Sequence, residues 1–480
     1  MRTFVARFRA TLPFVAPDDA QRLEIARLEL ARVATLGIAG ADATLSRDAM
    51  RESADALDGV RALVAAMPAA GPFAECLTRA AATLRATPDF DAFDRYAFVT
   101  RHATPAFQAL AALTARAAPA SLAASATLRR TWPLAAANVY DARAFDVMAF
   151  APHDAPRPTP ALVALGASLF ADPRLSGDGA RSCASCHVPT RGFSDGRARA
   201  RAARDDDTTT LRHTPPIRYA AWQPTQFADA RAATLEHQID SVLASRAEMH
   251  GTRGAIDGVA ARLAESAADR ARFAAATGVP ADRAVTPRAV RAALAAYLRT
   301  LARFDAPFDR AMRDAMRGDT SGAPLPIAAR RGFNVFMGRA GCGTCHFAPL
   351  FNGTAPPELV RSSPEVVGVA SASDDRVLDP DPGRGAIDRL AGHAHAFRTP
   401  TVRDAALGGP YMHNGALRTL DDLLDFYDRG GGAGRGVEVP NQTLSARPLR
   451  LTAEERADLV AFLRSLVDTT PPLPFTTTPR

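Results

Sequence analysis

Four of the five cysteines form two pairs with the same spacing, and a histidine follows each pair directly. The two motifs are Cys183, Cys186 and His187, and Cys342, Cys345 and His346. The pattern C-x-x-C-H is the attachment sequence for c-type haem, in which two thiols bind one porphyrin and the adjacent imidazole ligates its iron. The sequence therefore predicts two covalently bound c-type haems, with His187 and His346 as the proximal iron ligands.

The cysteine pairs have two other interpretations, a zinc site and a redox dithiol. Zinc ribbons place their two C-x-x-C pairs about 15 to 20 residues apart. Here one pair begins at residue 183 and the other at residue 342, and neither alternative explains a histidine after both pairs. We therefore favour haem. Cys76 stands alone in an apolar context, so we expect a small buried side chain there.

The sequence predicts that the segments that position these motifs are helices. Residues 1–150 are rich in alanine, leucine and arginine at helical spacing, which predicts a helical domain of unknown role. A proline-rich passage over residues 152–160 ends it. Residues 151–320 carry the first motif and residues 321–480 the second. Strand signals are sparse, so we predict an all-α fold with two tandem cytochrome c-like haem domains after the N-terminal domain.

A helix is also expected to close the second haem domain. Residues 451–467 are amphipathic and begin with the capping box Thr452-x-x-Glu455. Such a helix should pack over the second haem.

The composition restricts the other function classes. With 480 residues, of which 47% are hydrophobic and 23% charged, the chain should fold into about three globular domains. No apolar run approaches about 18 residues without a charge, so no membrane span is predicted. All 58 basic residues are arginines, and the densest basic run, 197–204, ends in three aspartates. This pattern is typical of a solvated loop and not of a nucleic-acid surface.

Haem attachment also predicts a location. It needs reduced thiols and export from the cytoplasm, so we expect a periplasmic protein. The N-terminus shows no signal peptide, because Arg7 and Arg9 interrupt the apolar stretch and no small-residue cleavage site follows.

A series of short motifs surrounds both attachment sequences. Around the first lie Leu169-Phe170-x-Asp172-x-Arg174-Leu175-Ser176, Arg212-x-Thr214-Pro215, Asp229-x-Arg231-Ala232, Leu235-Glu236-x-Gln238 and Glu248-Met249. After the second lie Arg398-Thr399-Pro400-Thr401-x-Arg403, Pro410-Tyr411-Met412-His413-Asn414-Gly415 and Thr419-Leu420. Over about residues 160–467 this order resembles the bacterial di-haem cytochrome c peroxidase and MauG family. The first 150 residues lie outside the resemblance.

The resemblance implies a cytochrome-c peroxidase-type oxidoreductase that acts on hydrogen peroxide. It implies that the first haem, held by His187, reduces peroxide. It implies that the second haem, held by His346, stores or relays oxidising equivalents. Such a pair of haems is compatible with a bis-ferryl-type intermediate. Gln238 and Glu248 match the distal amide and carboxylate, which can orient peroxide and move its proton. The implied electron donor is a small periplasmic cytochrome c or cupredoxin, unless a protein substrate takes its place.

Two departures from the family pattern concern the first iron and calcium. Many members carry a histidine that closes the resting first iron, but here Ala203 stands at that position and no histidine lies between His187 and His213. We therefore expect an open iron. His213 stands where the family has a calcium-binding asparagine, and Gly408 replaces a threonine of the same site. Calcium prefers oxygen ligands, so these changes argue against it as a further cofactor.

A third departure concerns the route between the haems. The family has a tryptophan directly before Asp-x-Arg, and Ala228 stands there instead. Trp222 and Phe227 are the nearby aromatic residues that could substitute for it.

The distal ligand of the second iron discriminates subfamilies. Fourteen residues after the histidine of the His-Asn-Gly motif, the resemblance implies Met in ordinary peroxidases and Tyr in MauG-like proteins, and here the residue is Tyr427. Phenolate is a hard anionic donor that stabilises ferric and higher iron oxidation states. The alternative is Met412 as the ligand, with Tyr427 as a core aromatic.

Three function hypotheses remain from the sequence. The first is a di-haem peroxidase that reduces hydrogen peroxide. The second is a MauG-like oxidase that modifies side chains of a partner protein. The third is a non-enzymatic di-haem electron-transfer cytochrome, against which Gln238 and Glu248 beside an open first iron argue.

Overall fold

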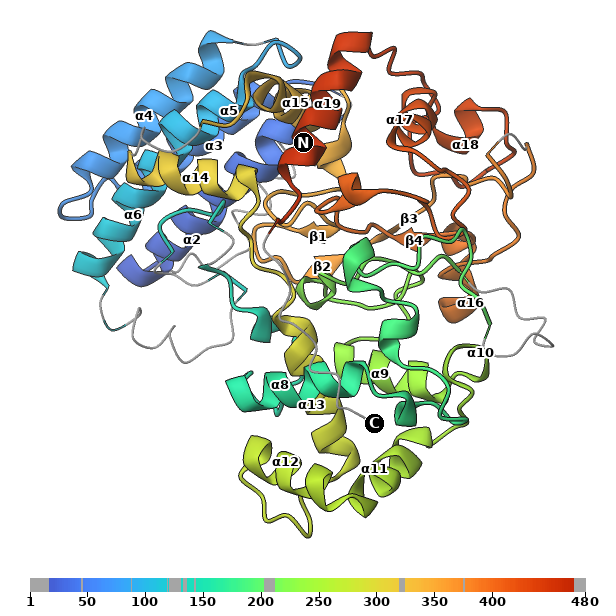
Figure 1. Ribbon diagram of the computed structural model, residues 1–480. Coiled ribbons are helices and arrows are strands. Elements are labelled where there is room, and N and C mark those ends of the chain that lie inside the picture. The colour runs from blue at the N-terminus through green and yellow to red at the C-terminus, as the bar shows by residue number, and fades with distance from the viewer. Residues whose placement is uncertain are drawn as a thin grey trace.

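The computed structural model describes residues 17–469 except for short segments. These exceptions are residues 45, 88, 119, 121–130, 133–135, 142–143, 203–211, 319–323 and 374–375. Helices make up almost all of the regular structure, and each strand in the described part of the chain is two residues long (Figure 1). The predicted all-α fold is therefore confirmed. No described helix is both long and apolar enough to cross a bilayer.

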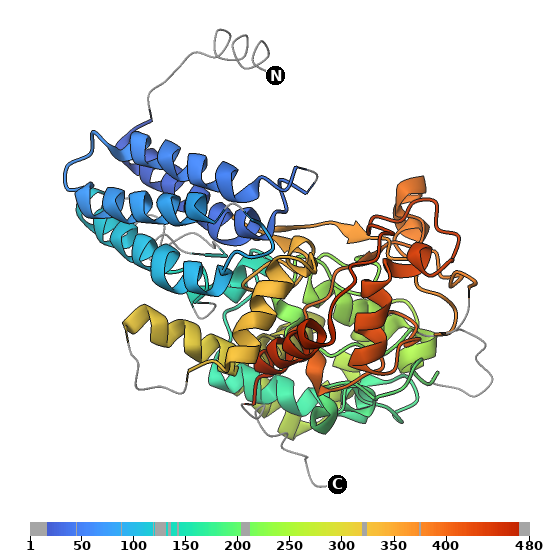
Figure 2. The same cartoon turned by 90° about the horizontal axis from the view of Figure 1, so that it is seen from above.

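The N-terminal segment folds into a bundle whose long helices lie side by side (Figure 2). Its helices are α2 (Asp19–Arg32, extended by the π-helical turn Val33–Gly37), α3 (Ala49–Val64), α4 (Gly71–Ala86), α5 (Arg95–Phe98) and α6 (Thr104–Ala117). Asp18 caps α2 by accepting a hydrogen bond from the amide of Gln21. Met50, Ala54 and Leu57 recur at helical spacing and bury one face of α3.

The first haem segment consists of six helices around its attachment loop. They are α8 (Pro160–Phe170), α9 (Leu235–Ala244), α10 (Arg246–Met249), α11 (Ala255–Glu265), α12 (Ala267–Thr277) and α13 (Pro287–Arg299). A threonine followed by proline starts both α8 and α13, and the hydroxyls of Thr159 and Thr286 accept hydrogen bonds from backbone amides in the first turn. The next helix, α14 (Pro307–Arg317), packs beside α6.

The second haem segment combines helices with two antiparallel strand pairs. Its elements are α15 (Ile327–Met337), β1 (Thr354–Ala355), β2 (Arg361–Ser362), β3 (Pro364–Glu365), α16 (Gly385–Asp388), β4 (Phe397–Arg398), α17 (Leu420–Asp428), α18 (Gly431–Gly434) and α19 (Ala453–Ser465). β1 pairs with β2 and β3 pairs with β4. The closing helix predicted over residues 451–467 is α19, and its capping box forms between Thr452 and Glu455.

The two haem segments repeat one helix crossing. α8 crosses α13 at Gly166, where an added Cβ would lie 1.9 Å from the carbonyl oxygen of Ala293. α15 crosses α19 at Gly332, where an added Cβ would lie 1.9 Å from the carbonyl oxygen of Asp458. Only glycine lets the two backbones approach this closely. The repeat agrees with two tandem cytochrome c-like units.

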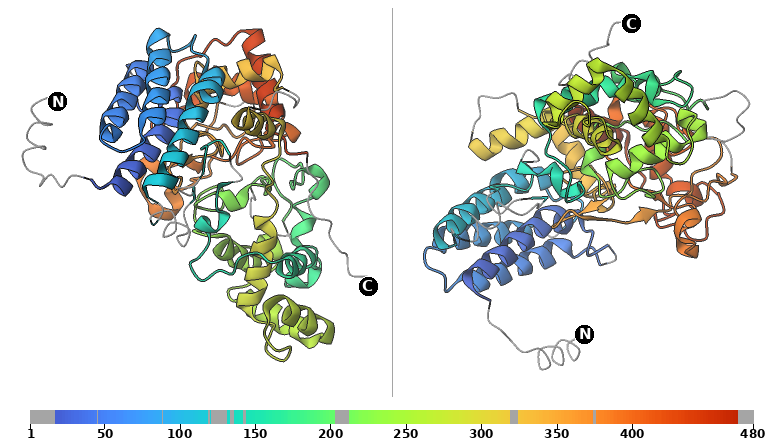
Figure 3. Two further views of the ribbon diagram at one scale, coloured as in Figure 1. Left: turned by 90° about the vertical axis from the view of Figure 1, so that its left-hand side faces the viewer. Right: turned by 90° about the horizontal axis from the view of Figure 1, so that it is seen from below.

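One apolar core runs through all three segments. It contains Phe107 of the N-terminal bundle, Tyr297 of the first haem segment and Phe462 of the second. Figure 3 shows the bundle beside the second haem segment, where α5 contacts α15. The domain boundaries near residues 150 and 320 stay a prediction, because the core does not divide there.

The glycine crossing of the second haem segment can be tested by its removal. We expect Gly332→Ala to lower the free energy of unfolding by about 3 kcal/mol, because the new methyl group overlaps the α19 backbone. The matched control is Gly59→Ala in α3, where an added Cβ meets no atom within 4 Å. That change should stabilise the helix by up to about 1 kcal/mol. Urea unfolding of both variants measures the difference, and equal midpoints would contradict the close crossing.

Candidate functional site

One cavity of about 2040 Å³ brings the predicted site residues together. Both attachment motifs line it, as do both candidate distal residues and both candidate ligands of the second iron. These lining residues are Cys183, Cys186, His187, Cys342, Cys345, His346, Gln238, Glu248, Tyr427 and Met412. Because residues far apart in the sequence meet around one cavity, the placement supports a single site with two cofactor positions.

The two attachment loops have the same local structure. Each cysteine pair begins a 3₁₀ turn, Cys183–Ser185 in the first loop and Cys342–Thr344 in the second. In both loops the backbone amide of the histidine donates to the carbonyl of the first cysteine at 2.9 Å. The turn therefore places two thiols and an imidazole on one wall of the cavity.

The two histidine rings are oriented alike. The Nδ1–H group of His187 donates to the carbonyl of Phe193 at 2.9 Å, and that of His346 donates to the carbonyl of Pro400 at 3.0 Å. This leaves Nε2 of each ring as the free iron ligand. Burial lowers the pKa of His187, and it lowers that of His346 to about 4. Both imidazoles are therefore neutral near pH 7, as a ligand must be.

The thiols fit haem attachment better than a zinc site. None of the cysteines in the described part of the chain forms a disulfide. Burial raises the pKa of Cys183 and of Cys342 to about 12, so both side chains are neutral thiols in the absence of a bound group. The two pairs also sit in separate loops. The cavity, the paired thiols and the oriented imidazoles together fit two c-type haems.

The candidate distal residues of the first site lie on α9 and α10. Gln238 is on α9, and an ion pair of 2.8 Å between Glu236 and the buried Arg299 ties this helix to α13. Glu248 is on the short helix α10, which begins where the Ser245 hydroxyl accepts a hydrogen bond from the Glu248 amide at 3.2 Å. These anchors direct both side chains to the cavity that His187 lines.

Glu248 has the charge environment of a proton-transfer group. Burial raises the pKa of Glu248, and the positive charge of Arg231 opposes part of the rise. Its negative charge in turn helps to raise the pKa of Cys186, which places Glu248 close to the first attachment loop. A buried carboxyl with a raised pKa can exchange a proton near the working pH.

Tyr427 and Met412 lie together on the side of the second haem. Both pack against the small apolar cluster of Val369, Leu417 and Phe426. Burial raises the pKa of Tyr427 well above its usual range, and the nearby thiols of Cys345 and Cys342 raise it further. The second attachment loop is therefore a neighbour of the Tyr427 hydroxyl. The structure therefore leaves both Tyr427 and Met412 as candidate ligands of the second iron.

His213 is held at the boundary between the two haem segments. Its backbone amide donates to the carbonyl of His413 at 2.7 Å, and its Nδ1–H donates to the carbonyl of Arg197 at 2.7 Å. His213 lines the same cavity as His187, and its charge adds to the burial that lowers the pKa of His187. It does not share α9 and α10 with the distal candidates. Ala203, from which the open iron was predicted, lies outside the described residues.

The aromatic residues considered as replacements for the interhaem tryptophan differ in position. Trp222 is 6% exposed and packs against Phe304, with ring centroids 4.9 Å apart, and it is not among the residues that line the cavity. Phe227 and Ala228 do line the cavity. The guanidinium of Arg231 stacks on the Phe227 ring, 3.5 Å from its centroid. Of the two aromatic candidates, Phe227 is therefore the one at the site.

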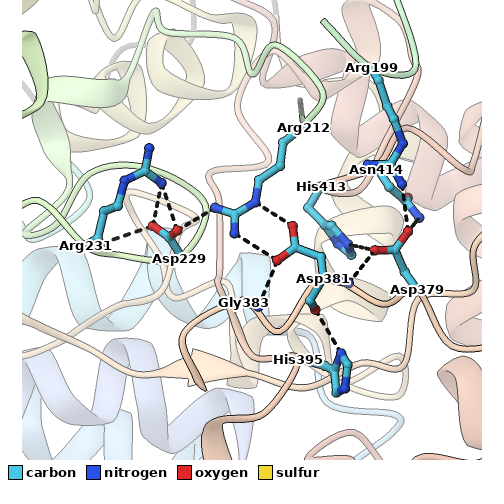
Figure 4. A network of polar contacts seen from close by, with 10 residues as sticks. All are labelled: Arg199, Arg212, Asp229, Arg231, Asp379, Asp381, Gly383, His395, His413 and Asn414. Carbon is cyan, nitrogen blue, oxygen red and sulfur yellow. Dashed lines mark hydrogen bonds and ion pairs between the residues drawn. The ribbon is translucent and has the colours of Figure 1, made fainter. Parts of the chain in front are cut away.

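A network of charged side chains joins the two haem segments beside the cavity (Figure 4). Arg212 donates to Asp229 of its own segment at 2.6 Å and to both carboxylate oxygens of Asp381 across the interface at 2.7 and 2.9 Å. Arg231 donates to both oxygens of Asp229, at 2.8 Å to the Oδ2 atom that Arg212 also contacts and at 3.0 Å to Oδ1. Burial opposes ionisation of Asp381, but the Arg212 hydrogen bonds outweigh it and hold the pKa below its usual value.

The network continues to the loop that carries Met412. Asp379 accepts hydrogen bonds from Arg199 at 2.8 Å, from Asn414 at 2.9 Å and from Nε2 of His413 at 3.2 Å (Figure 4). Burial alone would raise the pKa of Asp379, but the hydrogen bonds from His413 and Asn414 lower it well below its usual range. An ionised Asp379 therefore fixes the turn next to Met412.

Asp379, Asp381 and His413 have ligand atoms within 4.8 Å of one another, which is the spacing of a metal site. Arg199 and Arg212 already pair with these carboxylates. A cation at this point would face two guanidinium groups that neutralise its ligands. We therefore interpret this cluster as an ion-pair network and not as a metal centre.

This network was not predicted from the sequence. Arg212, Asp229 and Arg231 belong to the motifs on which the resemblance rests, but the sequence assigned them no role. Asp379 and Asp381 carried no signal at all, because acidic residues near glycine and proline are typical of any surface turn. Only the fold shows that this turn faces arginines that lie more than a hundred residues earlier in the chain.

Comparisons with known proteins agree with the geometry. The sequence model of the di-haem cytochrome c peroxidase family matches residues 160–317. The methylamine utilization protein MauG of Methylorubrum extorquens is 36% identical over 318 residues, which cover 66% of this chain and 81% of that protein. A cytochrome-c peroxidase of Denitromonas iodatirespirans is 35% identical over 331 residues, which cover 64% of this chain and 82% of that protein.

Solved structures show the same similarity. The crystal structure of a MauG-like protein associated with microbial copper homeostasis has a TM-score of 0.54 and 29% identity, and the match covers 66% of this chain and 92% of that one. A variant of the diheme peroxidase BthA from Burkholderia thailandensis has a TM-score of 0.50 and 25% identity, with 68% and 91% covered. The family match begins at residue 160, so the N-terminal bundle lies outside it.

The interface network can be tested through Arg212. Its replacement in Arg212→Gln removes a cation shared by two largely buried carboxylates, so we expect the free energy of unfolding to fall by about 2 to 3 kcal/mol. The control is Arg288→Gln, because the pair of Arg288 with Asp154 is about two-thirds exposed on both sides. That change should cost less than about 0.5 kcal/mol. Urea unfolding compares the two, and equal losses would contradict the role of the network.

Proposed function

The chain belongs to the di-haem cytochrome c peroxidase and MauG family, and we propose that it reduces hydrogen peroxide to water at the first haem. Membership of the family means that it is an oxidoreductase with two c-type haems. The observation that carries the specific proposal is the wall of the first site. A carboxyl with a raised pKa, Glu248, and an amide, Gln238, line the same cavity as His187.

The proposed roles of the distal side chains follow from their chemistry. Reduction of one peroxide molecule to two waters needs two electrons and two protons. The haem iron, when bound, supplies the electron transfer that breaks the O–O bond. Glu248 would accept the proton of one peroxide oxygen and return it to the other, which leaves as water. The oxygen that remains becomes the second water with the two electrons of the donor and two protons from solvent. The Gln238 amide holds the peroxide in position by hydrogen bonding.

Arg231 is proposed to tune this proton transfer. Burial alone favours the neutral form of Glu248, and the charge of Arg231 limits that effect. Arg231 is itself fixed by Asp229 and by its stacking on Phe227. The carboxyl can then be ionised before peroxide arrives and protonated afterwards, without a large change in free energy.

Tyr427 is proposed as the distal ligand of the second iron. Its position beside Cys342 and Cys345 supports this assignment, with Met412 as the alternative. The positive charge of a bound ferric ion would favour the phenolate over the neutral phenol. An anionic oxygen donor stabilises oxidised iron, so the second haem is proposed to store oxidising equivalents.

A second candidate function is oxidation of a partner protein's side chains. The presence of tyrosine at the ligand position, together with 36% identity to a MauG protein, favours it.

For the peroxidase function we propose a small periplasmic cytochrome c or cupredoxin as the electron donor. Both functions place the protein in the periplasm, where c-type haem is attached. Turnover with a generic electron donor, beside mass analysis of candidate partner proteins, distinguishes the two.

The peroxidase proposal can be tested with the ferric protein. We expect it to react with hydrogen peroxide without prior reduction, and Glu248→Gln to slow the reaction about 100-fold or more, because a positioned acid–base group is lost. The reaction should also slow as the pH falls through the pKa of Glu248, since only the carboxylate accepts the proton. Burial raises this pKa above 4.5, so the loss should occur at a higher pH than for an exposed glutamate.

Stopped-flow spectra at several pH values measure these rates. Glu265→Gln serves as the control, because Glu265 is exposed at the end of α11 and should leave both the rate and the pH profile unchanged. If the ferric protein does not react and only the half-reduced form does, the first iron is closed and the open-iron prediction is wrong. If Glu248→Gln keeps the acid limb, Glu248 is not the proton acceptor.

The ligand of the second iron can be tested by exchange. We expect Tyr427→Met to raise the reduction potential of that haem by on the order of 100 mV, because a neutral thioether favours ferrous iron more than phenolate does. Spectroelectrochemistry measures the potential, and the first haem should change little. Met412→Ala should leave the second haem unchanged. The reverse pattern, with Tyr427→Phe silent and Met412→Ala effective, would assign Met412 as the ligand.

A further inference from the structure

The N-terminal bundle is seated directly on the second haem segment. The backbone amide of Tyr96 donates to the side chain of Asn334 at 2.9 Å, and the same side chain donates to Asp94 at 3.0 Å. The Tyr96 ring also packs edge-on against Phe333, at 6.3 Å between centroids. Asn334 and Phe333 belong to α15, the helix that leads into the second attachment loop. α5 contacts α15, and Figure 1 shows the two helices next to each other.

The contact extends onto the attachment loop itself. A Cβ added at Gly338 would lie 2.5 Å from the guanidinium of Arg95, and one added at Gly343 would lie 3.4 Å from the side chain of Ala39. Gly343 stands between the two cysteines of the second motif. The bundle therefore touches the loop that carries the covalent attachment.

Two loops of the bundle form part of the cavity wall. Gly40, Ala43, Arg47 and Phe90 line the same cavity as the second attachment motif. These residues come from the α2–α3 connection and from the segment between α4 and α5. The attachment edge of the second haem site is therefore bounded by side chains that the family match does not include.

Phe90 has several contacts in this wall. Two guanidinium groups lie over its ring, that of Arg47 at 5.3 Å and that of Arg95 at 4.4 Å from the centroid. Arg95 is fully buried and donates to the backbone carbonyls of Ile38, Phe93 and Phe90, which ties the two loops together. An ion pair between Arg47 and Asp91 links the same loops at the surface.

We propose that the N-terminal helical domain is a functional wall of the second haem site. Phe90 closes the attachment edge of that haem against water and against outside electron-transfer reagents, and Arg47 sets part of its electrostatic field. The proposal depends on haem at the second site and not on the reaction at the first. In this proposal the bundle controls how the second haem exchanges electrons with its surroundings. A domain with a purely structural role would not do so.

Two physical effects follow from this wall. Electron transfer to a small reagent slows steeply with distance, so a side chain between the haem edge and the solvent lowers the rate. A nearby positive charge favours the reduced form of an iron centre, because reduction removes one positive charge. The hydrophobic shell and the charges around a metal site are general determinants of its potential.

The test uses the full-length protein with both haems reduced. Ferricyanide, a small anionic oxidant, is mixed with it, and oxidation of the second haem is followed from its low-spin absorption. We expect Phe90→Ala to speed this oxidation severalfold, with the reaction of the first haem with peroxide unchanged. Intact haem content and an unchanged peroxide reaction show that the variant is folded.

Charge provides a second measurement that does not disturb packing. Arg47 and Arg51 are both exposed arginines of the bundle, with 56% and 67% of their side chains accessible, and each pairs with one aspartate. Arg47 lines the cavity, whereas Arg51 is not among the residues that line it. We expect Arg47→Gln to lower the reduction potential of the second haem and Arg51→Gln to leave it unchanged.

The outcomes separate this proposal from the peroxidase function. A faster oxidation in Phe90→Ala and a lower potential in Arg47→Gln alone support the wall, even if peroxide is not turned over. Unchanged rate and potential in both variants would overturn it, whatever the peroxidase activity. Equal shifts in Arg47→Gln and Arg51→Gln would also overturn it, since they would reflect overall charge. If Phe90→Ala does not fold, the two arginine variants decide.

Discussion

Charge compensation at the interface between the two haem segments determines the geometry of the site. Arg212 binds carboxylates on both sides of this interface, Asp229 in its own segment and Asp381 in the other. Charges that leave water are costly unless they are paired, so the arrangement that forms these pairs is favoured over any that buries them unpaired. The single cavity exists in that arrangement. The relative positions of the two attachment loops, and of the side chains that face them, depend on it.

Carboxyl groups around the cavity have opposite electrostatic environments. Hydrogen bonds from His413 and Asn414 lower the pKa of Asp379, which stays charged as a structural anion. Burial raises the pKa of Glu248, and the partial compensation by Arg231 does not reverse it. The same side-chain chemistry thus holds the interface in one place and suits a proton-transfer role in another. The number of cations and hydrogen-bond donors around each carboxyl decides whether its pKa is lowered or raised.

The sequence predicted what depends on local spacing. The closing helix and its capping box at Thr452 were found where expected, because a capping box needs only a few consecutive residues. Trp222 could not be placed, since whether its ring faces the cavity or the core depends on neighbours such as Phe304. The interface network and the position of Phe90 were not predicted either. Their partners come from distant parts of the chain, and only the packed fold brings them together.

The two haem segments share their proximal structure and differ on the distal side. Both attachment loops hold the imidazole through Nδ1 and both use a glycine crossing of helices, so the iron-binding half of each unit repeats. On the other side, the first segment presents Gln238 and Glu248, which can bind and protonate a small oxidant. The second presents Tyr427 and Met412, which can occupy a coordination position. We therefore propose peroxide chemistry for the first unit and storage of oxidising equivalents for the second, a division that would arise from the distal side chains on otherwise similar frames.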